Sequence, residues 1–169
     1  MNYHLSPRVI LTNMQALAAV QSLAGNEQER ALLAPILCRE RNPLIAVMIR
    51  NAFADMVMRL GPKVADVSLG DETAGSPDDD TDLLDLDLHV ELYTPRTFTS
   101  GHHATIRRAM EQGIAFNALS MWSLATAGTG SASAGELADR FAGVAADWHR
   151  ALDVALTPGV HPGITEPYL

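Results

Sequence analysis

The hydrophobic residues of this chain recur at the spacing of an α-helix over most of its length. Capping residues and prolines mark where helices begin, and glycines mark where they end. The pattern therefore predicts a mainly α-helical chain with four to five helices. They run from Ser6 and Pro7 to Gly25, from Asn26 to about Leu37, from Asn42 and Pro43 to about Leu60, from Thr99 or Ser100 to about Thr126, and from Ser133 to about Leu156.

Residues inside these helices carry more specific predictions. Pro35 lacks a backbone donor, so it predicts a kink or a break in the second helix. Gly113 lies in the middle of the fourth helix, where it costs about 1 kcal/mol relative to alanine. Such a glycine indicates a close helix crossing. Ser133 and Glu136 have the spacing of a capping box and are expected to open the last helix.

The third helix is apolar on nearly all of its faces. A helix of this kind is buried on several sides, so it is predicted to be either a central element or a subunit interface. Its methionines Met48 and Met56 are candidate interface residues because methionine adapts to irregular surfaces. Core filling is the favoured use of the same side chains, and the adaptable interface is the alternative.

Between the third and fourth helices, apolar and polar residues alternate without error from Leu84 to Leu92. This is the period of a β-strand with one buried face and one solvent-exposed face. A lone strand is not stable, so it needs a partner. The partner is expected to be Val64–Leu69, paired antiparallel, or a strand of another subunit. The candidate interface row of this strand is Leu84, Leu86, Leu88, Val90 and Leu92.

Two segments are predicted to lack regular secondary structure. Residues 70–82 are acidic and rich in Gly, Ser and Pro, which is typical of a flexible loop. Residues 157–169 contain three prolines and two glycines, which predict an extended tail. Its candidate interface anchors are Val160, Ile164, Tyr168 and Leu169. The length of 169 residues fits a single domain over 1–169. The expected fold is a helical bundle with one inserted β-hairpin or strand and an extended C-terminal tail.

Composition narrows the function classes. The net charge is −8, with 20 acidic and 12 basic residues. A DNA-binding protein normally shows a basic face, so nucleic-acid binding is disfavoured. Cys38 is the only cysteine and has apolar neighbours, which predicts a small core residue. No apolar run approaches the ~20 residues that span a bilayer, and no signal-peptide pattern opens the chain. We therefore expect no membrane association and a cytoplasmic location.

Histidines are the strongest candidates for chemistry. His102 and His103 are adjacent on a helix and point about 100° apart, so they do not form a metal pair by themselves. His89 lies on the wet face of the strand. His149 follows Trp148 and is expected to face solvent. With no metal-binding or nucleophile motif in the chain, we expect no catalytic residue, no metal and no cofactor. A metal-dependent hydrolase using His89, His102 and His103 is an alternative hypothesis.

The segment from Leu84 to Leu156 resembles a family of small, uncharacterised proteins from prophage-type regions. The features that carry this resemblance are the alternating strand, a helix with His103, Arg107, Arg108, Glu111 and Trp122, a short Gly/Ala linker, and a last helix with Trp148 and Leu152. The overall plan is also similar to the head-completion and head–tail connector proteins of tailed phages. The resemblance implies a small helical bundle that assembles as a ring.

The sequence thus favours a structural, non-catalytic assembly protein, a phage or prophage head–tail connector or neck-type subunit. Its expected partners are its own copies or other virion proteins, and it would be virion-associated if phage-derived. The alternative is a small helical adaptor or regulatory protein that binds a protein partner through the methionine-rich helix or the strand edge.

Overall fold

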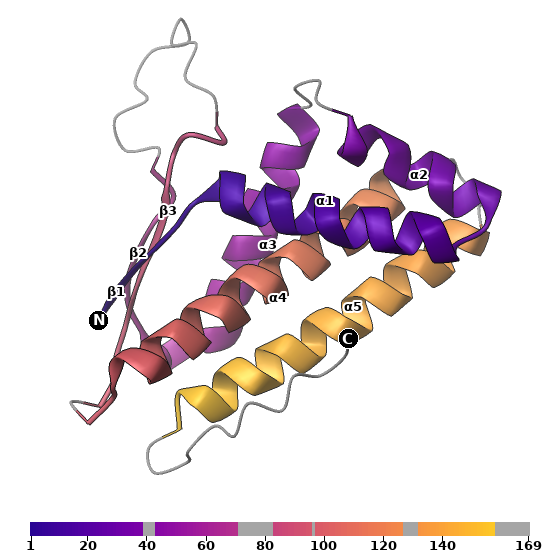
Figure 1. Cartoon of the computed structure of the whole chain (residues 1–169). Coiled ribbons are helices and arrows are strands. Elements are labelled where there is room, and N and C mark those ends of the chain that lie inside the picture. The colour runs from indigo at the N-terminus through magenta and orange to yellow at the C-terminus, as the bar shows by residue number, and fades with distance from the viewer. Residues whose placement is uncertain (39–42, 71–82, 96, 127–131, 158–169) are drawn as a thin grey trace, which may run out of the picture.

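The computed structural model describes residues 1–38, 43–70, 83–95, 97–126 and 132–157. Within them, five helices and a small antiparallel sheet confirm the predicted mainly α fold with an inserted hairpin (Figure 1). The predicted 70–82 loop lies almost wholly outside these residues, as does the tail beyond Thr157. The elements are β1 Asn2–Leu5, α1 Pro7–Ala24, α2 Glu27–Leu37, α3 Pro43–Leu60, the 3₁₀ turn η1 Gly61–Lys63, β2 Val64–Ser68, β3 Leu88–Leu92, α4 Ser100–Thr126 and α5 Ala132–Ala155.

The helix ends follow the local signals. Pro7 opens α1 directly after Ser6, and α1 stops at Gly25. Asn26 precedes α2, and its side-chain oxygen accepts a hydrogen bond from the backbone N–H of Glu29 at 2.9 Å. This bond satisfies one of the helix donors that lack a partner inside the helix. Boundaries of this kind depend on a single turn of chain, and the sequence predicted them correctly.

Around the end of α2 the structure departs from the sequence prediction in two respects. Of the kink or break predicted at Pro35, the break does not occur, because the helix continues through Pro35 to Leu37. Pro35 cannot donate to the carbonyl of Ala31 four residues earlier. The indole Nε1 of Trp122 donates to the next carbonyl, that of Leu32, at 2.9 Å and so ties this turn of α2 to α4. Cys38, which was expected in the core, follows the last helical residue and is exposed.

The helices α4 and α5 form the longest packed pair, lying side by side along most of their lengths (Figure 1). Gly113 of α4 faces α5, and a Cβ atom on it would lie 3.3 Å from Cδ2 of His149 and 3.6 Å from Cβ of Trp148. The absence of a side chain therefore lets the two helices approach closely, which confirms the predicted crossing at Gly113.

The sheet has the strand order β1-β3-β2, with all pairs antiparallel. The pairing of β2 with β3 confirms the predicted hairpin. The strand β1 was not predicted, and it pairs with the other edge of β3 in the register Tyr3 opposite Val90 and Leu5 opposite Leu88. Both edges of β3 are thus occupied within the chain, so no strand of a second chain can pair with it.

The central strand is shorter than the alternation predicted, because it begins at Leu88 and not at Leu84. The two strands that pair with β3 also end near this position. The strand β1 stops at Leu5, where Ser6 and Pro7 start a helix, and the pairing of β2 ends with Ser68 opposite His89. A strand without ladder partners is not maintained.

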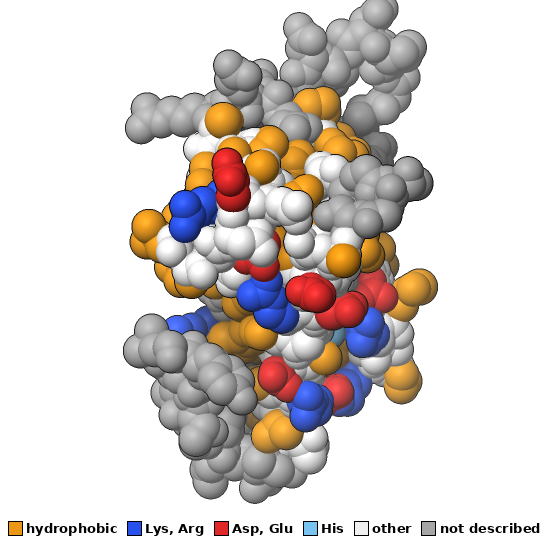
Figure 2. Space-filling model, turned by 90° about the vertical axis from the view of Figure 1, so that its right-hand side faces the viewer, with side chains coloured by type: hydrophobic (Ala, Val, Ile, Leu, Met, Phe, Trp, Pro, Cys, Tyr) orange, Lys and Arg blue, Asp and Glu red, His pale blue; other side chains and the backbone are white. Residues whose placement is uncertain are grey.

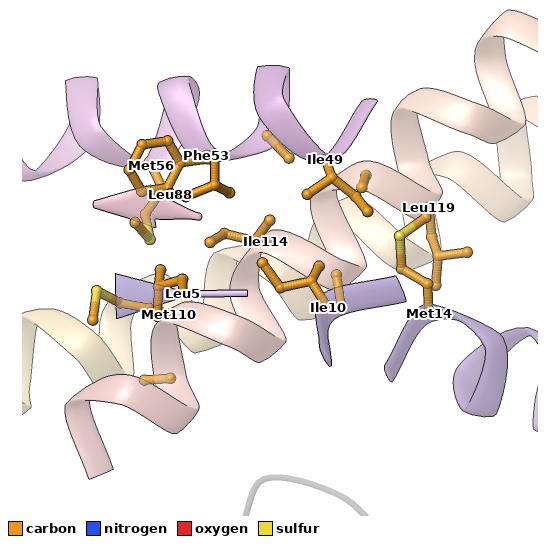
Figure 3. Close-up of a cluster of buried hydrophobic side chains, with 14 of the residues drawn as sticks. Leu5, Ile10, Met14, Ile49, Phe53, Met56, Leu88, Met110, Ile114 and Leu119 are labelled. Carbon is orange, nitrogen blue, oxygen red and sulfur yellow. The ribbon is translucent and has the colours of Figure 1, made fainter. Parts of the chain in front are cut away.

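A single cluster of buried side chains joins the sheet to the helices (Figure 3). In the close-up, Ile49, Phe53 and Met56 of α3 enter the cluster from one side, and Ile10 and Met14 of α1 enter it from the other. Met110, Ile114 and Leu119 of α4 contribute to the same cluster, as do Leu5 and Leu88 of the sheet. Burial of each such side chain contributes about 1.5–3 kcal/mol. The outward faces of α1 and α3 consequently point away from each other.

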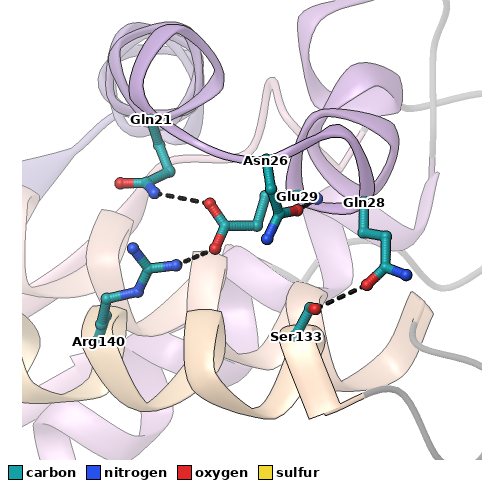
Figure 4. Close-up of polar contacts among 6 residues, drawn as sticks. All are labelled: Gln21, Asn26, Gln28, Glu29, Ser133 and Arg140. Atoms are coloured by element: carbon teal, nitrogen blue, oxygen red, sulfur yellow. Dashed lines mark hydrogen bonds and ion pairs between the residues drawn. The ribbon is translucent and has the colours of Figure 1, made fainter.

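A buried carboxylate fixes α2 against α1 and α5 (Figure 4). Glu29 is 5% exposed. It accepts a hydrogen bond from Nε2 of Gln21 at 3.0 Å and forms an ion pair with Arg140. Nearby, the hydroxyl of Ser133 donates to the side chain of Gln28 at 2.7 Å. The predicted capping role of Ser133 is wrong, because α5 already begins at Ala132 and the hydroxyl binds α2.

Candidate functional site

The row of strand residues that was predicted to form an interface is buried within the fold of the same chain. Leu84, Leu88, Val90 and Leu92 are buried against the helices, and Leu86 is partly buried. These side chains form the chain's own core, so they are not available to a partner while the fold is intact.

The other predicted interface residues have different positions. Met56 is buried in the core cluster, and Met48 is partly buried beside it. The tail anchors Val160, Ile164, Tyr168 and Leu169 lie outside the described residues.

The three histidines of the hydrolase hypothesis do not meet in one site. The ring of His89 lies against that of His4 with 4.7 Å between centroids, whereas His103 contacts the hydroxyl of Tyr3. Neighbouring residues of a strand point to opposite faces, so Tyr3 and His4 hold the two histidines apart. His102 binds Thr99 at the start of α4. No group of three potential ligands that could hold a metal ion occurs among the described residues.

His149 does not face solvent, contrary to the sequence prediction. Its ring packs on Gly113, and neither ring nitrogen has a hydrogen-bond partner among the described residues. Burial lowers the pKa of His149, and Arg59 lowers it further, whereas Asp55 and Asp153 act in the opposite direction. The neutral imidazole is therefore the favoured form in the folded state.

A pocket of about 350 Å³ lies between β1 and the first half of α4. Tyr3 lines it from the strand, and His103, Arg107, Arg108 and Glu111 line it from the helix. Positions 103, 107 and 111 are four residues apart, so they follow one face of α4. The sequence pointed to His103 as a candidate metal ligand and to Arg107, Arg108 and Glu111 through a resemblance, but it did not predict a pocket. Tyr3 was missed because β1 was not predicted.

The pocket combines a buried hydroxyl with a cationic side chain. The hydroxyl of Tyr3 lies 2.7 Å from Nδ1 of His103. Burial raises the pKa of Tyr3 to about 12, and the guanidinium of Arg107 acts in the opposite direction. Burial also raises the pKa of Glu111 above its ordinary value, again opposed by Arg107. Arg107 thus lies near both groups.

Two helices each expose a row of uncharged side chains, with one exposed arginine beside each row, Arg8 on α1 and Arg59 on α3. On α1 the exposed positions Val9, Thr12, Ala16, Ala19 and Leu23, which we call the α1 seam, alternate steps of three and four residues. On α3 the exposed positions Leu44, Val47, Asn51, Ala54 and Met58, which we call the α3 seam, follow the same steps. This is the spacing of the contact line in helix pairs that pack knobs into holes.

The seams differ from an ordinary solvated helix face. Leu23 is 86% exposed and Met58 is 75% exposed. By contrast, the exposed face of α5 carries Glu136, Asp139, Arg140, Arg150 and Asp153. Figure 2 shows the end of the molecule at the α1–α2 turn and the start of α5, where acidic and basic side chains lie close together among scattered hydrophobic ones. The uncharged rows on α1 and α3 therefore contrast with the charged exposed face of α5.

No helix among the described residues is both long enough and apolar enough to cross a membrane. Comparison with known proteins finds no family model, no curated protein and no solved structure that matches the chain.

Proposed function

We propose that this chain is a non-catalytic assembly subunit whose copies associate head to tail. In this arrangement the α1 seam of one copy packs against the α3 seam of the next. The observation that carries the proposal is the pair of exposed, uncharged and equally spaced seams on opposite sides of the core. A head–tail connector or neck-type subunit of a phage or prophage is the specific form that the sequence resemblance adds.

The chemistry of the seams favours a second copy as the occupant. The α1 seam consists mainly of small side chains, such as Ala16 and Ala19, whereas the α3 seam carries the larger Leu44 and Met58. Small residues on one helix leave room for large ones on the other. A chain with a net charge of −8 repels its own copies. Two uncharged faces are where this repulsion is least.

Head-to-tail contact has a consequence for the form of the assembly. Each contact uses two different surfaces, so every added copy presents a new seam for the next. Such contacts close into a ring when the rotation between copies returns to the start, and otherwise they build a filament. A ring has a mass that stays constant as the protein concentration rises, whereas a filament grows.

Three matched alanine substitutions test the proposal. Ala16→Glu places a charge in the α1 seam, Ala54→Glu places one in the α3 seam, and Ala142→Glu adds the same charge to the exposed face of α5. An unpaired charge at a buried contact costs about 3–5 kcal/mol, so association should weaken by two orders of magnitude or more. Sedimentation velocity and light scattering over a concentration series measure the mass. Ala16→Glu and Ala54→Glu should be monomers, and Ala142→Glu should assemble like the parent chain.

Mixing the two seam variants distinguishes head-to-tail from symmetric association. Ala16→Glu keeps an intact α3 seam and Ala54→Glu keeps an intact α1 seam, so an equimolar mixture should form a 1:1 heterodimer that grows no further. A symmetric α3–α3 contact would instead leave Ala16→Glu dimeric and the mixture unchanged. A parent chain that stays monomeric throughout the concentration series would refute the proposed function.

A further inference from the structure

The pocket between β1 and α4 is independent of the two seams, and its side chains specify a ligand class. We infer that it binds a small organic molecule through a carboxylate or phosphate group, with Arg107 as the principal anchor. Planar guanidinium groups bind both oxyanions through paired hydrogen bonds.

Arg107 is available for such a ligand. Among the described residues it makes no hydrogen bond and no ion pair, although an exposed arginine elsewhere, Arg150, pairs with Asp147 on its own helix. Arg107 and Arg108 both line the pocket, at the eighth and ninth positions of α4. The local field therefore favours an anion, in a chain whose net charge is −8.

Tyr3 and His103 form the polar wall of the pocket. Tyr3 is 2% exposed, and its hydroxyl is held 2.7 Å from Nδ1 of His103. This bond fixes the orientation of the imidazole, whose Nε2 makes no hydrogen bond within the described part of the chain. Met1 and Ala104, both exposed, supply apolar surface in the same pocket. A ligand with an oxyanion and a compact apolar body matches both parts.

Substitution of Glu111 tests whether the ligand of the pocket is an anion or a cation. Its carboxylate competes with an incoming oxyanion for Arg107, and its own burial already disfavours its charged form. Glu111→Gln should therefore tighten the binding of an anion. The same substitution should weaken the binding of a cation, for which the carboxylate is the attractive group.

The probes are benzoate and phenyl phosphate, with phenol as the uncharged control, titrated calorimetrically into the full chain at constant ionic strength. We expect saturable 1:1 binding of at least one anion, and the pair shows whether carboxylate or phosphate is preferred. Arg107→Gln should weaken binding about tenfold to a hundredfold, the range for a charged hydrogen bond. Tyr3→Phe should weaken it about twofold to tenfold, the range for a neutral one. Arg150→Gln removes an equal charge outside the pocket and should leave binding unchanged.

Three outcomes would overturn the inference. Neither anion binds the parent chain, or Arg107→Gln binds as well as the parent, or Arg150→Gln weakens binding as much as Arg107→Gln. Circular dichroism of each variant shows that the fold is intact. Because neither seam lines the pocket, monomeric Ala16→Glu should bind the anion like the parent chain. Anion binding is therefore measured independently of whether the chain assembles through its seams.

Discussion

Glu29 is the acidic side chain on which α1, α2 and α5 converge, and Arg140 is its cationic partner. Arg140→Met removes the charge of the partner but keeps most of its aliphatic stem. Breaking a fully buried ion pair costs about 3–5 kcal/mol because it leaves a buried charge without a partner. Here the side chain of Arg140 is 52% exposed and Gln21 still donates to the carboxylate. Solvent screening discounts the cost, so we expect the free energy of unfolding to fall by about 1.5–3 kcal/mol.

A double-mutant cycle separates the ion pair from lost packing. Glu29→Gln removes the buried charge, so Arg140→Met should cost less in that background, with a coupling energy of at least about 1 kcal/mol. Urea unfolding at pH 7, followed by tryptophan fluorescence and far-UV circular dichroism at one protein concentration, gives the four free energies. Arg150→Met is the control, because an exposed pair within one helix contributes no more than about 0.5 kcal/mol. A change below that value for Arg140→Met, or a coupling near zero, would refute the reasoning.

Three further substitutions test the packing of single residues. Gly25→Ala would place a Cβ atom against Oε2 of Glu29 and 2.9 Å from the backbone oxygen of Gln21, so the free energy of unfolding should fall by about 1–3 kcal/mol in urea. Unchanged stability would show that the carboxylate is not held there. The unfolded chain takes up a proton near the ordinary histidine pKa of 6.5, whereas the folded chain binds it at lower pH. His149 therefore contributes stability above about pH 6.5 that is lost as the pH falls toward the folded pKa, by up to about 1.4 kcal/mol per unit. Urea titrations of His149→Gln at pH 7, 6 and 5 should show a flatter dependence, and an equal slope would contradict the buried position. Trp122→Phe removes the donor to the Leu32 carbonyl and should lower the melting temperature at a cost of about 1–3 kcal/mol; an unchanged melting temperature would mean that the bond contributes nothing.

The helix boundaries and the β2–β3 hairpin were predictable because their causes are local. Asn26 needs only the backbone three residues later to cap α2. The alternation that ends at Leu92 needs only a nearby extended segment to pair with. The row of apolar residues showed that one face of the strand is buried, but not whether a helix of the same chain or another subunit covers it.

The candidate pocket shows why other features were missed. Tyr3 belongs to a four-residue strand that pairs with a segment more than 80 residues away, and nothing in its neighbours predicts that partner. The same holds for Glu29, which suits a capping role near the start of α2 but binds Arg140, 111 residues further along the chain.

By itself, then, the sequence determined approximately where the helices begin and end, which face of the strand ending at Leu92 is apolar, and that Gly113 allows a close crossing. Only the tertiary structure decided what each apolar face packs against. It buried the predicted interface leucines in the core, left the α1 and α3 seams exposed, and brought Tyr3 to His103. The physical reason is the sequence separation over which each interaction acts. Helix caps and hydrophobic periodicity depend on residues a few positions apart, whereas burial depends on which distant segments fold onto the same side of the core.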